Sequence, residues 1–124
     1  MKIIQLECAL TVNCPFGGFI SRRMLVESDG MGFTITNTVI PVSGRAEHWH
    51  YKQHLEACYC ISGRGILRDL VTDMEHLIVP GTVYALDKHD DHAFEALEEV
   101  TLICVFNPPL KGMEIHQEDG SYAK

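Results

Sequence analysis

The chain contains 124 residues, 46% of them hydrophobic and 22% charged, and carries a formal net charge of −7 at pH 7. This length supports one domain with a single hydrophobic core, and the negative charge opposes binding to nucleic acids or anionic membranes. No apolar run is long enough to span a membrane and the first seven residues do not resemble a signal peptide. The five cysteines lie mostly in apolar runs, which indicates reduced thiols in a cytoplasmic protein.

The N-terminal quarter of the chain alternates short β-type runs with turns. We expect a short strand at Ile3–Leu6 and a loop at Asn13–Gly18, where proline and glycine interrupt any regular pattern. An extended segment is expected at Phe19–Val26, and Glu27–Gly30 reads as a turn. Alternation along the extended segment places Arg22 and the next residue, Arg23, on opposite faces.

The run Gly32–Ile40 carries the clearest strand signal in the chain. Apolar side chains alternate with the hydroxyl groups of Thr34, Thr36 and Thr38, and β-branched residues with period two are typical of strands. The threonine face is either solvent-exposed or part of a polar interior, and the pattern alone does not decide between these.

Metal-binding side chains are concentrated in the segment that follows. Within nine residues the chain places His48, His50, His54 and Glu56, and imidazole and carboxylate are the groups that most often bind divalent iron, zinc, nickel or manganese. This spacing predicts a metal site. Two cysteines, at 58 and 60, share a strand face with Glu56, so a thiolate ligand is an alternative, although no second cysteine pair supports it.

The second half of the chain predicts further short strands separated by glycine turns and by the polar loop Asp87–His92. The expected strands are Ile66–Leu70, Met74–Val79, Val83–Leu86, Ala93–Ala96 and Val100–Phe106. The last of these is apolar on both faces, as in a strand packed inside a sandwich or barrel. Because no window shows a helical stripe, the pattern predicts an all-β barrel or sandwich, with residues 1–124 forming one domain.

Two blocks of this sequence resemble the signatures of the cupin superfamily. In the first block Glu56 is followed at the family spacing by Gly63. The second block is Pro80-Gly81-Thr82-Val83-Tyr84, in which Tyr84 stands where cupins commonly place a metal-binding histidine. The resemblance implies a single-domain cupin-type β-barrel, that is, a double-stranded β-helix.

A narrower resemblance is to the L-ectoine synthase family. It is carried by Tyr51–Gly63, Tyr84–His92, Cys104–Pro108 and Glu114–Tyr122, and runs in one register from about Phe19 to the C-terminus. That family closes N-γ-acetyl-L-2,4-diaminobutyrate to the cyclic amidine ectoine with loss of water, using Fe(II) in a cupin barrel. The resemblance therefore implies a small-molecule substrate, Fe(II) or another divalent metal as cofactor, and a homodimer. Phe19 departs from the family, which usually has tryptophan there.

The resemblance and the chemistry together assign candidate site residues. By resemblance the metal ligands are Glu56, Tyr84 and His92. The reaction also needs an acid or base near the amine and carbonyl, a donor fork for the substrate carboxylate, and apolar walls. The candidates are Tyr51, Glu114 and His116 as acid or base, Arg22 or Arg23 with Thr38 for the carboxylate, and Cys104 with Phe106 as walls.

Two other functions also fit the sequence. One is a different metal-dependent cupin enzyme acting on a related small amino-acid derivative, with His48, His50 and Glu56 as ligands. The other is a non-catalytic cupin that binds a small ligand. Cupin folds support many chemistries, so these alternatives stay open on the signatures alone.

Overall fold

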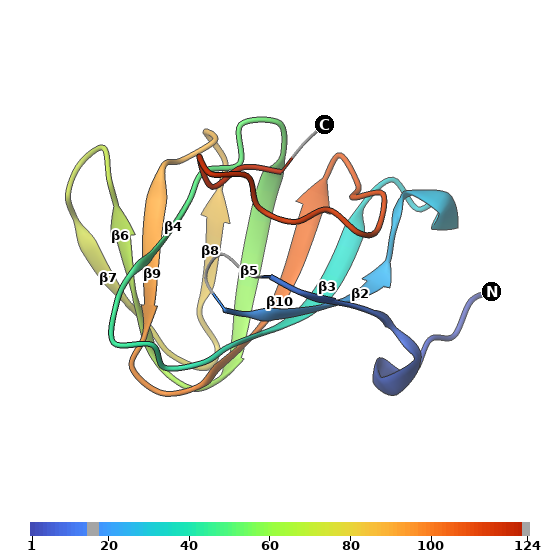
Figure 1. Cartoon of the computed structure of the whole chain (residues 1–124), viewed down its shortest axis with the longest axis horizontal. Helices are drawn as coiled ribbons and strands as arrows, with labels where there is room; N and C mark the ends of the chain where they lie inside the picture. Colours follow the sequence, from blue (N-terminus) through green and yellow to red (C-terminus); the bar gives the residue numbers. More distant parts are fainter. Residues whose placement is uncertain (15–17, 123–124) are drawn as a thin grey trace.

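The computed structural model describes residues 1–14 and 18–122, which form two antiparallel β-sheets (Figure 1). The larger sheet has six strands in the order β1-β2-β3-β10-β5-β8, and the smaller has four in the order β4-β9-β6-β7. The strands are β1 (Leu10–Asn13), β2 (Ile20–Leu25), β3 (Thr34–Ile40), β4 (Glu47–Trp49), β5 (Leu55–Ser62), β6 (Gly65–Asp69), β7 (Glu75–Ile78), β8 (Val83–Leu86), β9 (His92–Ala96) and β10 (Val100–Asn107). The all-β prediction is confirmed.

The N-terminus differs from the prediction. Residues Ile3–Leu6 do not form a strand; Leu6–Cys8 instead make one turn of 3₁₀ helix, and Ile3 is 80% exposed. A short apolar run forms a strand only where a partner strand satisfies its backbone, and these residues have no such partner in the described part of the chain. The first strand is β1, which pairs with β2. Part of the expected loop, residues 15–17, lies outside the described residues.

The central strands of the large sheet create a polar interior face. Thr34, Thr36 and Thr38 on β3 are 0%, 1% and 8% exposed, so the threonine face points inward. On the neighbouring strand β10, Leu102, Cys104 and Phe106 are buried, whereas Val105 on the opposite face is 37% exposed. The described chain therefore covers β10 on one face rather than on both.

After β10 the chain runs across one end of the two sheets without forming a strand (Figure 1). The backbone N–H of His50 donates to the carbonyl of Gly120, and the backbone N–H of Leu110 donates to the hydroxyl of Thr34. These bonds attach this C-terminal segment, residues 108–122, to both sheets. None of the helices in residues 1–14 and 18–122 is long and apolar enough to span a membrane.

Candidate active site

A small cavity of about 20 Å³ lies between the inner faces of the two sheets. Several of the side chains around it are residues that the resemblance and the chemistry assigned to the site, and period-two alternation brings those on β3, β5, β8 and β10 to the inner faces of these strands. The predicted site residues in its lining are Thr38, Tyr51, Glu56, Tyr84, Cys104 and Phe106. The structure thus brings together residues from four strands and from the loop after β4.

Glu56 is the one acidic side chain in this lining, and it is only 8% exposed. Burial holds the pKa of its carboxyl group well above the usual value, and the nearby Cys104 thiol adds to this effect. Tyr84, on the neighbouring strand β8, also has a raised pKa because it is desolvated. A buried carboxyl group with no cationic partner is unfavourable when ionised, and a bound metal ion would offset that cost.

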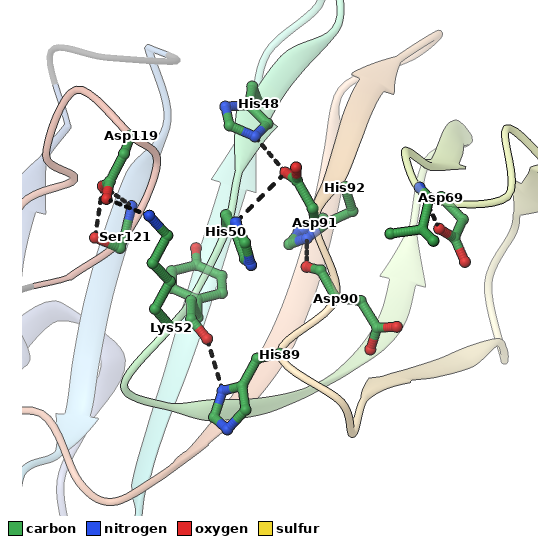
Figure 2. A network of polar contacts seen from close by, with 12 residues as sticks. His48, His50, Lys52, Asp69, His89, Asp90, Asp91, His92, Asp119 and Ser121 are labelled. Carbon is green, nitrogen blue, oxygen red and sulfur yellow. Dashed lines mark hydrogen bonds and ion pairs between the residues drawn. The ribbon is translucent and has the colours of Figure 1, made fainter.

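His92 is held in a suitable form for metal binding at the start of β9. Its Nδ1–H donates to the carbonyl oxygen of Asp90 at 2.9 Å, which leaves the lone pair of Nε2 available (Figure 2). Burial lowers its pKa and so favours the neutral imidazole. His92 and Tyr84 together line a second, larger cavity of about 390 Å³ among β6, β7 and β8. The donor chemistry of Glu56, Tyr84 and His92 therefore fits a divalent metal ion.

Within the described residues, however, His92 does not belong to the tightest group of donor atoms. Among the histidine, cysteine, aspartate and glutamate donors there, only Glu56, Cys58 and Cys104 bring three ligand atoms within 4.8 Å of one another. Cys58 pairs with Cys104 across the strands, and the pKa of the Cys104 thiol is lowered chiefly because it accepts a hydrogen bond from Cys58.

Tyr51 connects the cavity to a buried histidine. Its hydroxyl group lies 2.6 Å from Nε2 of His116, and both side chains are almost fully buried. Burial raises the pKa of Tyr51, and burial together with the positive charge of Arg23 lowers that of His116 to about 3. The pair is therefore neutral at pH 7, and Nδ1 of His116 has no hydrogen-bond partner in the described residues.

Arg23 is a buried cation on β2, only 2% exposed. Its guanidinium group donates to Ser21 Oγ at 3.3 Å and to the Gly112 carbonyl at 3.0 Å. The carboxylate of Glu114 lies 3.7 Å away. Burial of Glu114 opposes ionisation, but the backbone N–H groups of residues 111 and 112 and the charge of Arg23 lower its pKa overall. Arg22 is half-buried on the opposite face of β2, and neither arginine is among the residues that line the small cavity.

His48, His50 and His54, the closely spaced histidines of the sequence, do not line the small cavity. Because Trp49 points into the core, His48 and His50 face outward at the rim, where both contact the carboxylate of Asp91 (Figure 2). The contact from His50 Nδ1 is 3.7 Å long. His54 is buried, and its carbonyl oxygen accepts a hydrogen bond from His89. The described residues do not bring His48 or His50 into a donor group with Glu56.

Comparison with known proteins supplies the family. The family model described as ectoine synthase matches residues 5–124. The chain belongs to the ectoine synthase family. The match begins further toward the N-terminus than the start near Phe19 that the motifs indicated.

Two relatives illustrate this family membership. The chain is 54% identical over 127 residues to an L-ectoine synthase of Desulfatibacillum aliphaticivorans, covering 98% of this chain and 96% of that protein. It is 50% identical over 111 residues to an L-ectoine synthase of Wolinella succinogenes, covering 90% and 84%.

Solved structures agree with both the family and the fold. The crystal structure of ectoine synthase from P. lautus is similar with a TM-score of 0.83 and 38% identity, covering 90% of this chain and 81% of that one. A cupin domain of Schizosaccharomyces pombe Cnp3, at 10% identity and a TM-score of 0.61, shows likeness of fold alone. The predicted cupin fold is confirmed.

Several cavity residues of this ectoine synthase family member were not predicted from the sequence. They are Phe19, Ser21, Ile40, Trp49, Leu102 and Tyr122. Ser21 shares a strand face with Arg23, so alternation offered a signal for it. Tyr122 belongs to the C-terminal segment, which has no periodicity, and no local pattern marks it.

Proposed function

We propose that this chain closes N-γ-acetyl-L-2,4-diaminobutyrate to ectoine with release of water, as a hydro-lyase of compatible-solute biosynthesis under osmotic stress. Family membership along residues 5–124 carries the proposal. The cavity lining supports it with a carboxyl group and phenol groups, and the buried imidazole of His116 contacts one of these phenols, that of Tyr51.

The reaction forms one C–N bond and breaks one C–O bond. The α-amine attacks the acetyl carbonyl carbon, the former carbonyl oxygen leaves as water, and the two hydrogens of that water come from the amine. Glu56, Tyr84 and His92 are the proposed metal ligands. Bound there, Fe(II) or another divalent metal would supply a Lewis acid that polarises the carbonyl oxygen.

The remaining roles follow from the contacts of the side chains. Tyr51 lines the cavity and is hydrogen-bonded to His116, so this pair is proposed to move protons between the amine and the leaving oxygen. Arg23, with Thr38 on the neighbouring strand β3, is proposed to attract the substrate carboxylate, since the one carboxylate that it contacts among the described residues is 3.7 Å away. Because the carboxylate of Glu114 contacts Arg23, we propose that Glu114 also positions the guanidinium group, in addition to its proposed acid–base role.

Turnover of two isomers tests this proposal. Under anaerobic, iron-replete conditions, mass spectrometry should detect loss of water from the γ-acetyl compound and much slower loss from the α-acetyl isomer. In the α-isomer the carbonyl lies beside the carboxylate anchor, away from the metal position. Absence of dehydration of the γ-acetyl compound would refute the assigned reaction.

A metal analysis tests the ligands separately. Glu56→Ala and His92→Ala should each lose iron while the secondary structure is kept, whereas His48→Ala, at the rim, should retain it. Full iron occupancy in the first two variants would contradict the ligand assignment, whatever the reaction proves to be.

A homodimer in the cytoplasm is the proposed state of the protein. The outer face of the large sheet exposes apolar side chains, among them Tyr59 at 45%, Val83 at 60% and Val105 at 37%. Pairing of two copies would cover such a face. All five cysteines are free thiols, which supports a reducing compartment. A monomeric mass by light scattering at micromolar concentration would contradict the dimer.

A further inference from the structure

Two cysteines face each other inside the protein, directly beside Glu56. Cys58 on β5 is the cross-strand partner of Cys104 on β10, and Tyr84 on β8 lies opposite Cys58 on its other side. The cysteines are 1% and 3% exposed. A row formed by the partly buried Tyr84 and by the buried Cys58 and Cys104 therefore crosses three strands, and Glu56 lies on the same face of β5, two residues before Cys58.

The donor atoms of this group are close enough to share one ion. One carboxylate oxygen of Glu56 and the two sulfur atoms lie within 4.8 Å of one another. Around a tetrahedral zinc ion, with bonds of about 2.0–2.3 Å, neighbouring ligand atoms are separated by about 3.3–3.8 Å. Side-chain movements of about 1 Å would therefore close the group around an ion.

Ordinary core packing explains the position of Cys60, but it explains the convergence of Cys58 and Cys104 on Glu56 less well. Cys60 is on the same face of β5 and 0% exposed, but its sulfur donates to the carbonyl of Ser62 at 3.4 Å and belongs to no group of three donor atoms in the described part of the chain. Cys60 thus behaves as a small buried side chain. Cys58 and Cys104 instead converge on the buried carboxyl group of Glu56, which has no cationic partner among the described residues, and the proposed proton transfers use neither thiol.

We infer that Glu56, Cys58 and Cys104 form a second coordination mode of this site, which binds a thiophilic divalent cation of the zinc type through one oxygen and two sulfur atoms. Thiolate ligands favour zinc over harder ions, and zinc lies above iron(II) in the general order of affinities. Because Glu56 also belongs to the proposed iron set, zinc bound in this way excludes iron(II). The inference rests on Glu56 of the proposed site and not on the cyclisation reaction.

X-ray absorption at the zinc edge tests this mode, because zinc–sulfur bonds of about 2.3 Å are resolved from zinc–nitrogen and zinc–oxygen bonds of about 2.0–2.1 Å. The full chain is stripped with a chelator, kept reduced and anaerobic, and given one equivalent of Zn²⁺. The wild type and the matched control Cys60→Ala should each show two sulfur neighbours. Cys58→Ala and Cys104→Ala should each show one, and the double variant none.

Three results would overturn the inference: only nitrogen and oxygen neighbours in the wild type, the same loss of sulfur in Cys60→Ala as in Cys58→Ala, or unchanged sulfur in the double variant. If Cys58→Ala does not fold, Cys58→Ser, which keeps the unbranched shape of the side chain and removes the sulfur, takes its place. Two sulfur neighbours in a protein that fails to cyclise the γ-acetyl compound would refute the proposed reaction and leave the zinc mode intact. Cyclisation with iron, together with no sulfur neighbours around zinc, would refute the zinc mode and leave the proposed reaction intact.

Discussion

The buried histidine His116 should make this protein sensitive to mild acid. Burial and the charge of Arg23 lower its pKa from 6.5 to about 3 in the folded chain, so the folded state keeps the imidazole neutral where the unfolded state protonates it. The unfolded state then binds more protons, and stability falls as the pH drops below 6.5, with a slope of about 1.4 kcal/mol per unit. Between pH 6.5 and pH 4.5 this one group should remove about 2 kcal/mol.

His116→Gln removes the titrating group and keeps a neutral acceptor for the hydroxyl of Tyr51. Urea unfolding of the chelator-treated protein, followed by the fluorescence of its single tryptophan, Trp49, gives the free energy of unfolding at each pH. The variant starts less stable, because it loses the stacking of the imidazole on Trp49 and Tyr122, but its deficit should shrink by about 2 kcal/mol on going to pH 4.5. All other groups titrate in both proteins, so they cancel in the comparison.

His76→Gln, at an exposed position on β7, controls for the loss of a histidine and should follow the wild type. Parallel stability curves for the wild type and His116→Gln would show that the folded protein does not hold this imidazole neutral, and the physical account of the Tyr51–His116 pair would then be wrong.

The other predictions concern catalysis and a turn. Tyr51→Phe removes the hydroxyl that contacts His116 and should lower kcat by about 100-fold or more in steady-state assays while the fold is kept. Arg23→Lys keeps the charge but loses the donor fork, and a loss of about 2 kcal/mol corresponds to a fall of about 30-fold in kcat/KM. Arg22→Lys, on the other face of β2, should change kcat/KM by less than about threefold, and equal losses in both would refute the carboxylate role. Gly63 and Gly30 have φ values of +80° and +75°, but only at Gly63 would a Cβ overlap a backbone carbonyl group. In urea unfolding, Gly30→Ala should cost about 1 kcal/mol and Gly63→Ala about 3 kcal/mol or more, and similar costs would contradict the steric argument.

The strands were predictable where alternation and pairing agree. Gly32–Ile40 was expected as a strand and contains β3, because its period-two pattern matches a sheet with one face inward. Ile3–Leu6 has a similar apolar composition but forms no strand, since a strand also needs a partner, and local sequence does not show which segments pair. The same limit applies to the threonine face of β3, which faces the interior because Thr36 and Thr34 pair in register with the buried Cys104 and Phe106 of β10.

The local sequence pattern predicted the site residues less completely than it predicted the strands. Alternation places Arg22 and Arg23 on opposite faces but does not say which face is inside, and only the packing of β2 over the C-terminal segment decides it. The density of histidines at 48–54 favoured a metal site made by neighbours in sequence, whereas the donors that lie close together come from β5 and β10. Cross-strand register, which brings Cys104 beside Cys58, depends on residues more than forty positions apart.

The wall of the cavity comes partly from outside the two sheets. Tyr122, in the C-terminal segment, lines the cavity, and His116 of the same segment contacts the hydroxyl group of Tyr51. This segment is packed into the core, since Leu110, His116 and Tyr122 are each no more than 2% exposed. The proposed proton-transfer pair is therefore formed between the loop after β4 and a segment that belongs to neither sheet, and tertiary packing rather than any local pattern fixes its geometry.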